Sequence, residues 1–221
     1  MTSVRAQGEA DVIAPERGQR RFRPDIQAMR ALAVALVVIF HLWPTVLPGG
    51  YVGVDVFFVL SGFLMSSHLL HVDNRRGREV LDFWSRRIRR IIPVALFVLV
   101  FTLIAGRLLL PPTRWSPDAL GVMASATFWE NWNLAISSVQ YLAADDAPTL
   151  TQHFWSLSVE EQFYLVWPLL FAVAALIAAR LRKSRLAWIS GAIALVVAVS
   201  LLISIRWTAI EAGSAYFSTF T

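Results

Sequence analysis

Two side chains with the capacity for chemistry, Arg30 and His41, mark an apolar segment that contains no Asp, Glu, Lys or Arg from residue 31 to residue 54. At about 100° per residue, their spacing is about three helical turns, so both point the same way, about 16 Å apart along the axis. Lipid gives an imidazole no partner, so His41 must face protein or water. We interpret His41 as either a general base near neutral pH or a packing histidine bonded to a carbonyl. Arg30 is either a functional cation or an arginine that reaches the membrane interface.

A second polar group lies between His153 and Tyr164, where a polar stretch gives way to an apolar one. If a helix begins at Ser156, then Ser156, Glu160 and Tyr164 share one face. A carboxylate that enters a membrane must be paired or protonated. Alternatively, Ser156 caps the helix and Glu160 interacts favourably with its dipole. The two interpretations are compatible.

The segment that begins with Gly53 carries a third candidate, Asp55. A short connection can bring Asp55 near His41, so Asp55 or Glu160 could orient the imidazole. Gly53 and Ser61 are small enough to allow close helix contact. Ser61 is not expected to be a hydrolase nucleophile, because the Gly-x-Ser-x-Gly pattern is missing from the sequence.

Four arginines, Arg86, Arg87, Arg89 and Arg90, precede Pro93. We expect them in a loop at the cytoplasmic face. Such a cluster can follow from membrane orientation alone or contact anionic lipid. It can equally bind the phosphates of a cytoplasmic cofactor, because guanidinium groups match phosphate geometry.

The elements that position these residues are predicted to be membrane helices. Hydrophobic residues make up 57% of the chain, charged residues 16%, and the mean hydropathy is +0.57, which is too apolar for an ordinary soluble domain. With no cysteine there is no thiolate metal site, and no metal is expected. The prediction is an all-α polytopic membrane protein with about five spanning helices. They are expected at about residues 31–47, 54–70, 91–110, 162–179 and 186–205.

The basic residues predict the orientation of these helices. They concentrate before the first segment, between the second and third, and between the fourth and fifth, whereas only Arg107, Arg114 and Arg206 fall in the alternate connections. The positive-inside rule therefore predicts a cytoplasmic N-terminus and explains the net charge of +5 without nucleic acid. Residues 1–24 are expected to form a disordered tail and residues 25–221 the membrane domain. An extracytoplasmic interfacial or re-entrant helix is expected at about residues 117–141.

In this order, the four motifs resemble membrane acyltransferase family 3, the domain of bacterial surface-polysaccharide O-acetyltransferases. The resemblance covers about residues 23–221. It rests on Arg30 with His41, on Gly53–Phe63, on the arginine motif before Pro93, and on His153–Tyr164. The family domain usually has more helices than are expected here, so the resemblance implies the N-terminal part of a family domain, truncated relative to the family.

The resemblance implies transfer of an acyl group, usually acetyl, from cytoplasmic acyl-CoA to a hydroxyl of an extracytoplasmic glycan or glycolipid. The setting would be a bacterial plasma membrane, with membrane lipid and no nucleic acid as partners. The implied catalytic residues are His41, Glu160 and Asp55, the donor-binding residues Arg30, Arg86, Arg87 and Arg90, and the supporting residues His153, Ser156 and Tyr164. Acceptor and acyl length stay open. The alternatives are an inactive fragment of such an enzyme and a non-enzymatic transporter or scaffold.

Overall fold

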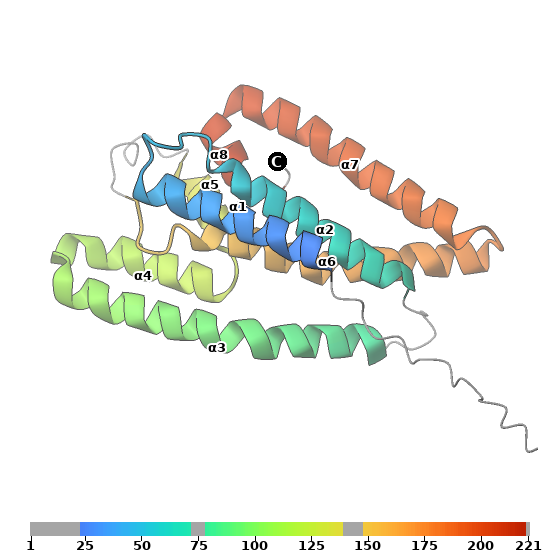
Figure 1. Cartoon of the computed structure of the whole chain (residues 1–221), viewed down its shortest axis with the longest axis horizontal. Helices are drawn as coiled ribbons and strands as arrows, with labels where there is room; N and C mark the ends of the chain where they lie inside the picture. The colour runs from blue at the N-terminus through green and yellow to red at the C-terminus, as the bar shows by residue number, and fades with distance from the viewer. Residues whose placement is uncertain (1–22, 72–77, 139–147, 220–221) are drawn as a thin grey trace, which may run out of the picture. The chain divides into compact units, whose positions relative to one another are not determined.

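The computed structural model describes residues 23–71, 78–138 and 148–219, and all the regular structure in these ranges is helical (Figure 1). The tail predicted over residues 1–24 therefore falls almost wholly outside the described residues. The helices are α1 (Pro24–Leu42), α2 (Val52–His71), α3 (Arg78–Leu109), α4 (Pro112–Ala126), α5 (Glu130–Ser137), α6 (Phe154–Arg180), α7 (Arg185–Ile210) and α8 (Ala212–Phe217).

Five of these helices, α1, α2, α3, α6 and α7, are long and apolar enough to cross a membrane. A spanning helix needs about 20 apolar residues, and their outer surfaces carry many exposed leucine, valine and phenylalanine side chains. These observations confirm the predicted all-α polytopic membrane fold.

Several elements differ from the sequence-based boundaries. The first spanning helix runs Pro24–Leu42 where about 31–47 was predicted, and the fifth extends to Ile210 where an end near residue 205 was predicted. The third spanning helix begins at Arg78 and includes the arginines that were expected in a loop. The fourth begins at Phe154 with no side-chain cap, so Ser156 lies inside the helix and is not its cap. The connection between them holds two described helices, α4 and α5, where one was expected. Part of that expected helix, residues 139–141, lies outside the described residues.

The contact pattern divides the chain into two units, Met1–Leu60 and Ser61–Thr221, which are described separately. In the first unit, α1 packs against the start of α2 through glycine. A Cβ on Gly53 would clash with the carbonyl oxygen of Ala33, and one on Gly50 would lie 2.5 Å from that of Leu36. Close approach of the two backbones therefore requires glycine at these positions.

The second unit is built around α6, which forms an antiparallel hairpin with α7 (Figure 1). Phe171 and Ala174 of α6 pack with Met65 of α2 and Ile189 of α7 in the main core. The indole nitrogen of Trp167 also donates to Ser66 Oγ at 2.8 Å. This core holds α6 in the middle of its neighbours, so polar side chains on α6 are enclosed by protein.

The shorter helices cover the N-terminal part of α6. Helix α3 continues into α4 as a hairpin, and α5 packs against α6 and α8 (Figure 1). Leu99 of α3 and Phe154 of α6 form a second small core. The arrangement encloses the start of α6, where the second predicted motif lies.

Candidate active site

Arg30 and His41 both lie on α1, in agreement with the prediction that one helix carries both residues. The Arg30 guanidinium carbon is 4.7 Å from the centre of the Phe57 ring of α2, within the same unit. This is the geometry of a cation–π contact, which holds the charge against the helix. His41 is in the last turn of α1 and is exposed, with its ring edge-on to Phe40 at 5.4 Å.

The hydrogen bond of His41 fixes which of its nitrogens can act as a base. Nδ1 lies 2.8 Å from the Val37 carbonyl oxygen. A carbonyl only accepts, so Nδ1 carries the hydrogen and donates it. Nε2 of the neutral ring then keeps its lone pair for another group. The bond to a carbonyl agrees with the packing interpretation, and the general-base interpretation stays a prediction that concerns Nε2.

Asp55 lies in the first turn of α2 and is exposed. Within the described residues, no hydrogen bond or ion pair joins it to His41, whose Nδ1 is already bonded to Val37. The structure therefore does not bring the predicted carboxylate and imidazole of the first unit into contact. Glu160, the other predicted partner, belongs to the second unit.

In the second unit, Arg87 of α3 is the cation of a polar cluster on α6. Its Nη2 lies 2.6 Å from Glu161 Oε1 and 3.4 Å from Glu160 Oε1. Its Nε donates to Glu161 Oε1 at 2.8 Å and to Oε2 at 3.1 Å. Its guanidinium carbon lies 3.3 Å from the centre of the Tyr164 ring. The partner that the predicted membrane carboxylate Glu160 requires is therefore Arg87, which lies far earlier in the chain on α3.

Ser61 of α2 completes what we call the Arg87 cluster, which consists of Ser61, Arg87, Glu160, Glu161 and Tyr164. Ser61 Oγ donates to Glu160 Oε1 at 3.0 Å, and both residues are buried. One guanidinium thus faces two carboxylates. If both carboxylates are ionised, the cluster keeps a net negative charge, and it can take up one proton without losing its ion pair. Such an arrangement can hold or move a proton inside the bundle.

The other arginines of the motif have different surroundings. Arg86 and Arg90 are exposed, whereas Arg87 is partly buried. Arg90 and His153 line a 430 Å³ pocket between α3 and α6, whose other lining residues are apolar and include Val94 and Leu157. The pocket lies about one helical turn along α6 from the Arg87 cluster. The pocket thus has the exposed Arg90 guanidinium at its edge and apolar side chains along the rest of its wall.

His153 and Ser156 lie just outside the Arg87 cluster. The His153 ring contacts the Phe154 ring at a tilt of 55°, with centres 4.9 Å apart. Ser156 Oγ donates weakly to the His153 carbonyl oxygen at 3.5 Å. Of the three residues predicted to share one face of α6, only Glu160 and Tyr164 belong to the cluster.

Glu130, which no motif indicated, is a buried carboxyl group at the start of α5, outside the spanning helices. Oε1 accepts from Thr149 Oγ1 at 3.3 Å and Thr151 Oγ1 at 3.5 Å, and Oε2 accepts from Asn133 Nδ2 at 3.2 Å. Burial raises the pKa of Glu130 to about 7. The hydrogen bonds from these neutral donors lower the pKa, but their effect is smaller than that of burial. Acidic residues are common in helices outside the membrane spans, so the sequence does not indicate that Glu130 is buried. Only the fold shows it.

A network of neutral hydrogen bonds next to Glu130 ties α6 to α5 and to the C-terminal segment. Gln162 Nε2 donates to Asn131 Oδ1 at 2.9 Å, and Thr219 Oγ1 donates to Gln162 Oε1 at 2.7 Å. Asn131 is fully buried. The polar surface of α6 thus continues from Glu160 and Glu161 into this network. In the described part of the chain, no group of three His, Cys, Asp or Glu could hold a metal ion.

Together, the fold and the site define a polytopic α-helical membrane protein with an arginine–carboxylate cluster inside its bundle. A family model described as an acyltransferase domain, acyltransferase family 3, matches residues 23–220. The chain belongs to this acyltransferase family, and the resemblance of its motifs is confirmed.

Two relatives indicate what kinds of protein carry this domain. The chain is 36% identical over 153 residues to peptidoglycan O-acetyltransferase OatA of Listeria monocytogenes, which covers 69% of this chain and 24% of that protein. It is 40% identical over 154 residues to O-acetyltransferase OatA of Staphylococcus aureus, which covers 67% of this chain and 24% of that protein. The chain therefore spans about a quarter of the length of these relatives. No solved structure matches it.

Proposed function

We propose that this chain is the donor-binding and proton-accepting part of an integral-membrane O-acyltransferase. The observation that carries the proposal is the hydrogen bond of His41 Nδ1 to a carbonyl, which leaves Nε2 as a base on the helix that also bears Arg30. The names of the relatives support O-acetyl transfer as the reaction. The donor is acetyl-CoA, and the acceptor is a hydroxyl of an extracytoplasmic glycan or glycolipid.

The reaction needs a base that accepts the proton of the acceptor hydroxyl and a proton donor for the leaving thiolate. His41 Nε2 takes the proton of the acceptor hydroxyl as its oxygen attacks the thioester carbonyl carbon. The carbon–sulfur bond breaks, and the thiolate of CoA leaves and takes up the proton from the imidazolium. The products are the O-acetyl ester and free CoA. Asp55, which lies in the same unit as His41, is the carboxylate that stabilises the positive charge that forms on the imidazole in this proposal.

The arginines supply the donor site in this proposal. Arg86 and Arg90 of α3 bind the phosphates of CoA, since guanidinium groups form paired hydrogen bonds with phosphate. Arg87 is already bonded to both carboxylates and acts as a positioning residue that joins the donor site to Glu160. The pocket beside Arg90 and His153 receives the thinner, less polar arm of the donor. Ser156 and Tyr164 support the start of α6 around it.

The basic connections support an orientation with the N-terminus in the cytoplasm of a bacterial cell and the donor site on the same side. The acceptor then reaches His41 from the other side, because His41 ends α1 far from Pro24. Acyl transfer across the bilayer follows from a helix that carries a cation near one end and a base near the other.

Release of CoA tests this proposal, because the chain contains no cysteine and a thiol reagent therefore reports only the product. The chain is reconstituted in lipid vesicles with acetyl-CoA and muropeptides or a glycolipid acceptor. His41→Ala should reduce the rate by at least about 100-fold, the usual contribution of a general base. His68→Ala, which removes an imidazole of α2 outside the site, is the matched control. Equal rates for the His41→Ala and unchanged chains would refute the role of His41. An inactive unchanged chain would favour the two alternatives, an inactive fragment of such an enzyme or a non-enzymatic protein.

A further inference from the structure

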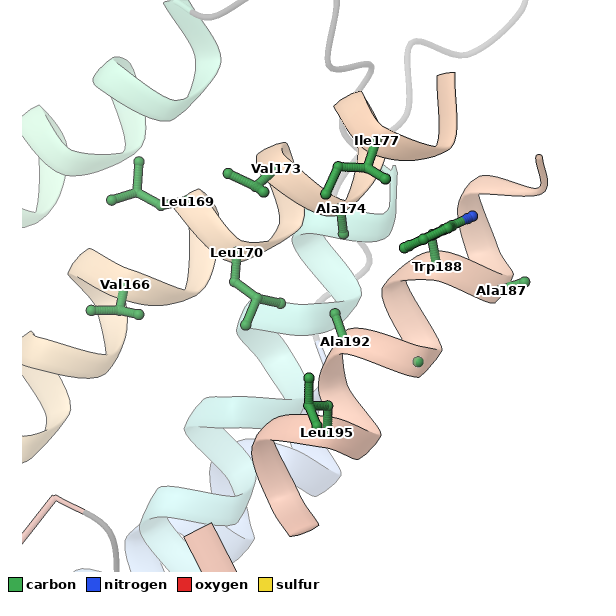
Figure 2. A pocket seen from close by; sticks show the side chains of 11 residues that line it. Val166, Leu169, Leu170, Val173, Ala174, Ile177, Ala187, Trp188, Ala192 and Leu195 are labelled. Carbon is green, nitrogen blue, oxygen red and sulfur yellow. The ribbon is translucent and has the colours of Figure 1, made fainter. Parts of the chain in front are cut away.

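The α6–α7 hairpin contains an apolar groove that the proposed reaction does not use. Its volume is 690 Å³, and it is lined by eleven residues, among them Val166, Leu170 and Ile177 of α6 and Trp188 and Leu195 of α7. Figure 2 shows the Trp188 ring and the Leu195 side chain on α7 facing the Leu170 and Ala174 side chains of α6. Both helices are long and apolar enough to span a membrane, so the groove opens among acyl chains.

The length of the groove matches one leaflet of a bilayer. On α6 it runs from Val166 to Ile177, which is about 16 Å at 1.5 Å per residue, roughly half of the ~30 Å hydrocarbon core. Its average cross-section is then about 40 Å², about half that of a helix ~10 Å across. The groove is therefore too narrow to enclose a further helix, whereas thinner acyl chains fit along it.

One end of the groove lies beside a cluster of positive charge. Ile177 is three residues before Arg180, which ends α6, and the turn that follows carries Arg182 and Lys183. All three basic side chains are exposed. From Gln162 to Ile210 the sequence contains no Asp or Glu, so no acidic residue lies in α7 or in the part of α6 that follows Glu161. Trp188 lines the groove at the same end, where tryptophan favours the boundary between headgroups and acyl chains.

Membrane orientation alone explains basic residues in a connection. It does not explain an adjoining apolar groove of one leaflet's depth. We propose that the α6–α7 hairpin binds an anionic phospholipid, with its acyl chains in the groove and its headgroup phosphate on Arg180, Arg182 and Lys183. The site is separate from the Arg87 cluster, and the proposal does not depend on the acyltransferase activity.

Gly191 gives a direct probe of the groove. It lines the groove, and a Cβ added there would meet nothing within 4 Å. Because the chain is cysteine-free, Gly191→Cys labelled with a bimane fluorophore carries one probe. Val197→Cys is the matched control, since Val197 is exposed on about the opposite face of α7. The labelled chains are reconstituted in vesicles that contain either dibrominated phosphatidylglycerol or dibrominated phosphatidylcholine, whose bromines quench the probe on contact.

The expected result is a preference for phosphatidylglycerol at the groove probe and little preference at the control probe. Each basic side chain near the surface strengthens binding of an anionic lipid by about fivefold, so a preference of at least about fivefold is expected. The triple change Arg180→Gln, Arg182→Gln and Lys183→Gln should bring it close to one. Equal quenching by the two lipids at the groove probe would overturn the proposal. So would a groove probe that neither lipid quenches, since a protein segment or second copy would then cover it.

Discussion

Replacing Arg87 with methionine should destabilise the second unit by about 3 kcal/mol, because it leaves two carboxylates without their cation. Removal of one partner from a buried ion pair costs about 3–5 kcal/mol. The side chains of Arg87, Glu160 and Glu161 are 19%, 10% and 17% exposed, so the lower end of that range applies. At 1.4 kcal/mol per factor of ten, this is about a 100-fold change in the equilibrium constant for unfolding.

Unfolding of the purified chain in mixed micelles, at increasing mole fractions of sodium dodecyl sulfate, measures this change. Far-UV circular dichroism reports the loss of helix. Tryptophan fluorescence reports the tertiary structure through the nine tryptophans of the chain, among them Trp84, whose Nε1 donates to the Tyr164 carbonyl oxygen at 3.0 Å. Arg86→Met is the matched control, since Arg86 is exposed on the same turn of α3. It should change the free energy of unfolding by less than about 0.5 kcal/mol.

A double-mutant cycle separates the ion pair from other effects of the methionine. Glu161→Gln removes the charge that Arg87 contacts most closely, so the two changes together should cost less than their sum by about 1–3 kcal/mol. Additive costs, or an Arg87→Met chain as stable as Arg86→Met, would refute the reading of Arg87 as the cation that compensates both carboxylates.

Two further predictions concern other positions. Glu130 has a pKa of about 7 in the folded chain and about 4.5 in the unfolded chain, so the folded state keeps its proton longer and stability falls as pH rises from about 4.5 to 7, by up to about 3 kcal/mol. Glu130→Gln, which imitates the protonated acid, should remove this loss of stability. The prediction is contradicted if the free energy of unfolding changes between pH 4.5 and pH 8 by the same amount in the variant and in the unchanged chain. Gly53→Val should separate α1 from the start of α2 and cost at least about 1–3 kcal/mol, because its side chain meets the Ala33 carbonyl. Gly49→Val, at a position with open space, is the control, and equal melting temperatures for the two variants would contradict the proposed close contact.

The sequence predicts the spanning helices well because length and apolar composition alone satisfy a bilayer. It predicts the start of α3 poorly. A run of arginines indicates the end of a membrane helix when the sequence shows no carboxylate that could pair with them. The partner of Arg87 is Glu161, which lies 74 positions later, and only the fold brings the two together. The motif around Glu160 correctly indicated a carboxylate that needs compensation, but its spacing could not identify the arginine.

The hydrogen-bond partner of His41 and the burial of Glu130 could not be predicted from the sequence either. Asp55 was a reasonable partner for His41, since a short connection separates their helices. The Val37 carbonyl bonds Nδ1 instead, because a residue in a helix always has the carbonyl four positions earlier within reach. Glu130 is buried by two threonines from a later segment, and a single carboxylate in a helix gives no signal of such burial.

The ion pair between Arg87 and Glu161 also bears on biogenesis. Helix α3 leaves the ribosome before α6 is synthesised, so Arg87 reaches the membrane before its carboxylate partner exists. An arginine near the middle of an inserting helix costs about 2.5–3.5 kcal/mol at the translocon. The long apolar stretch of α3 after Pro93 offsets this cost during insertion. The charge of Arg87 is compensated only after α6 has been made, so the polar part of this bundle assembles in the order of the chain.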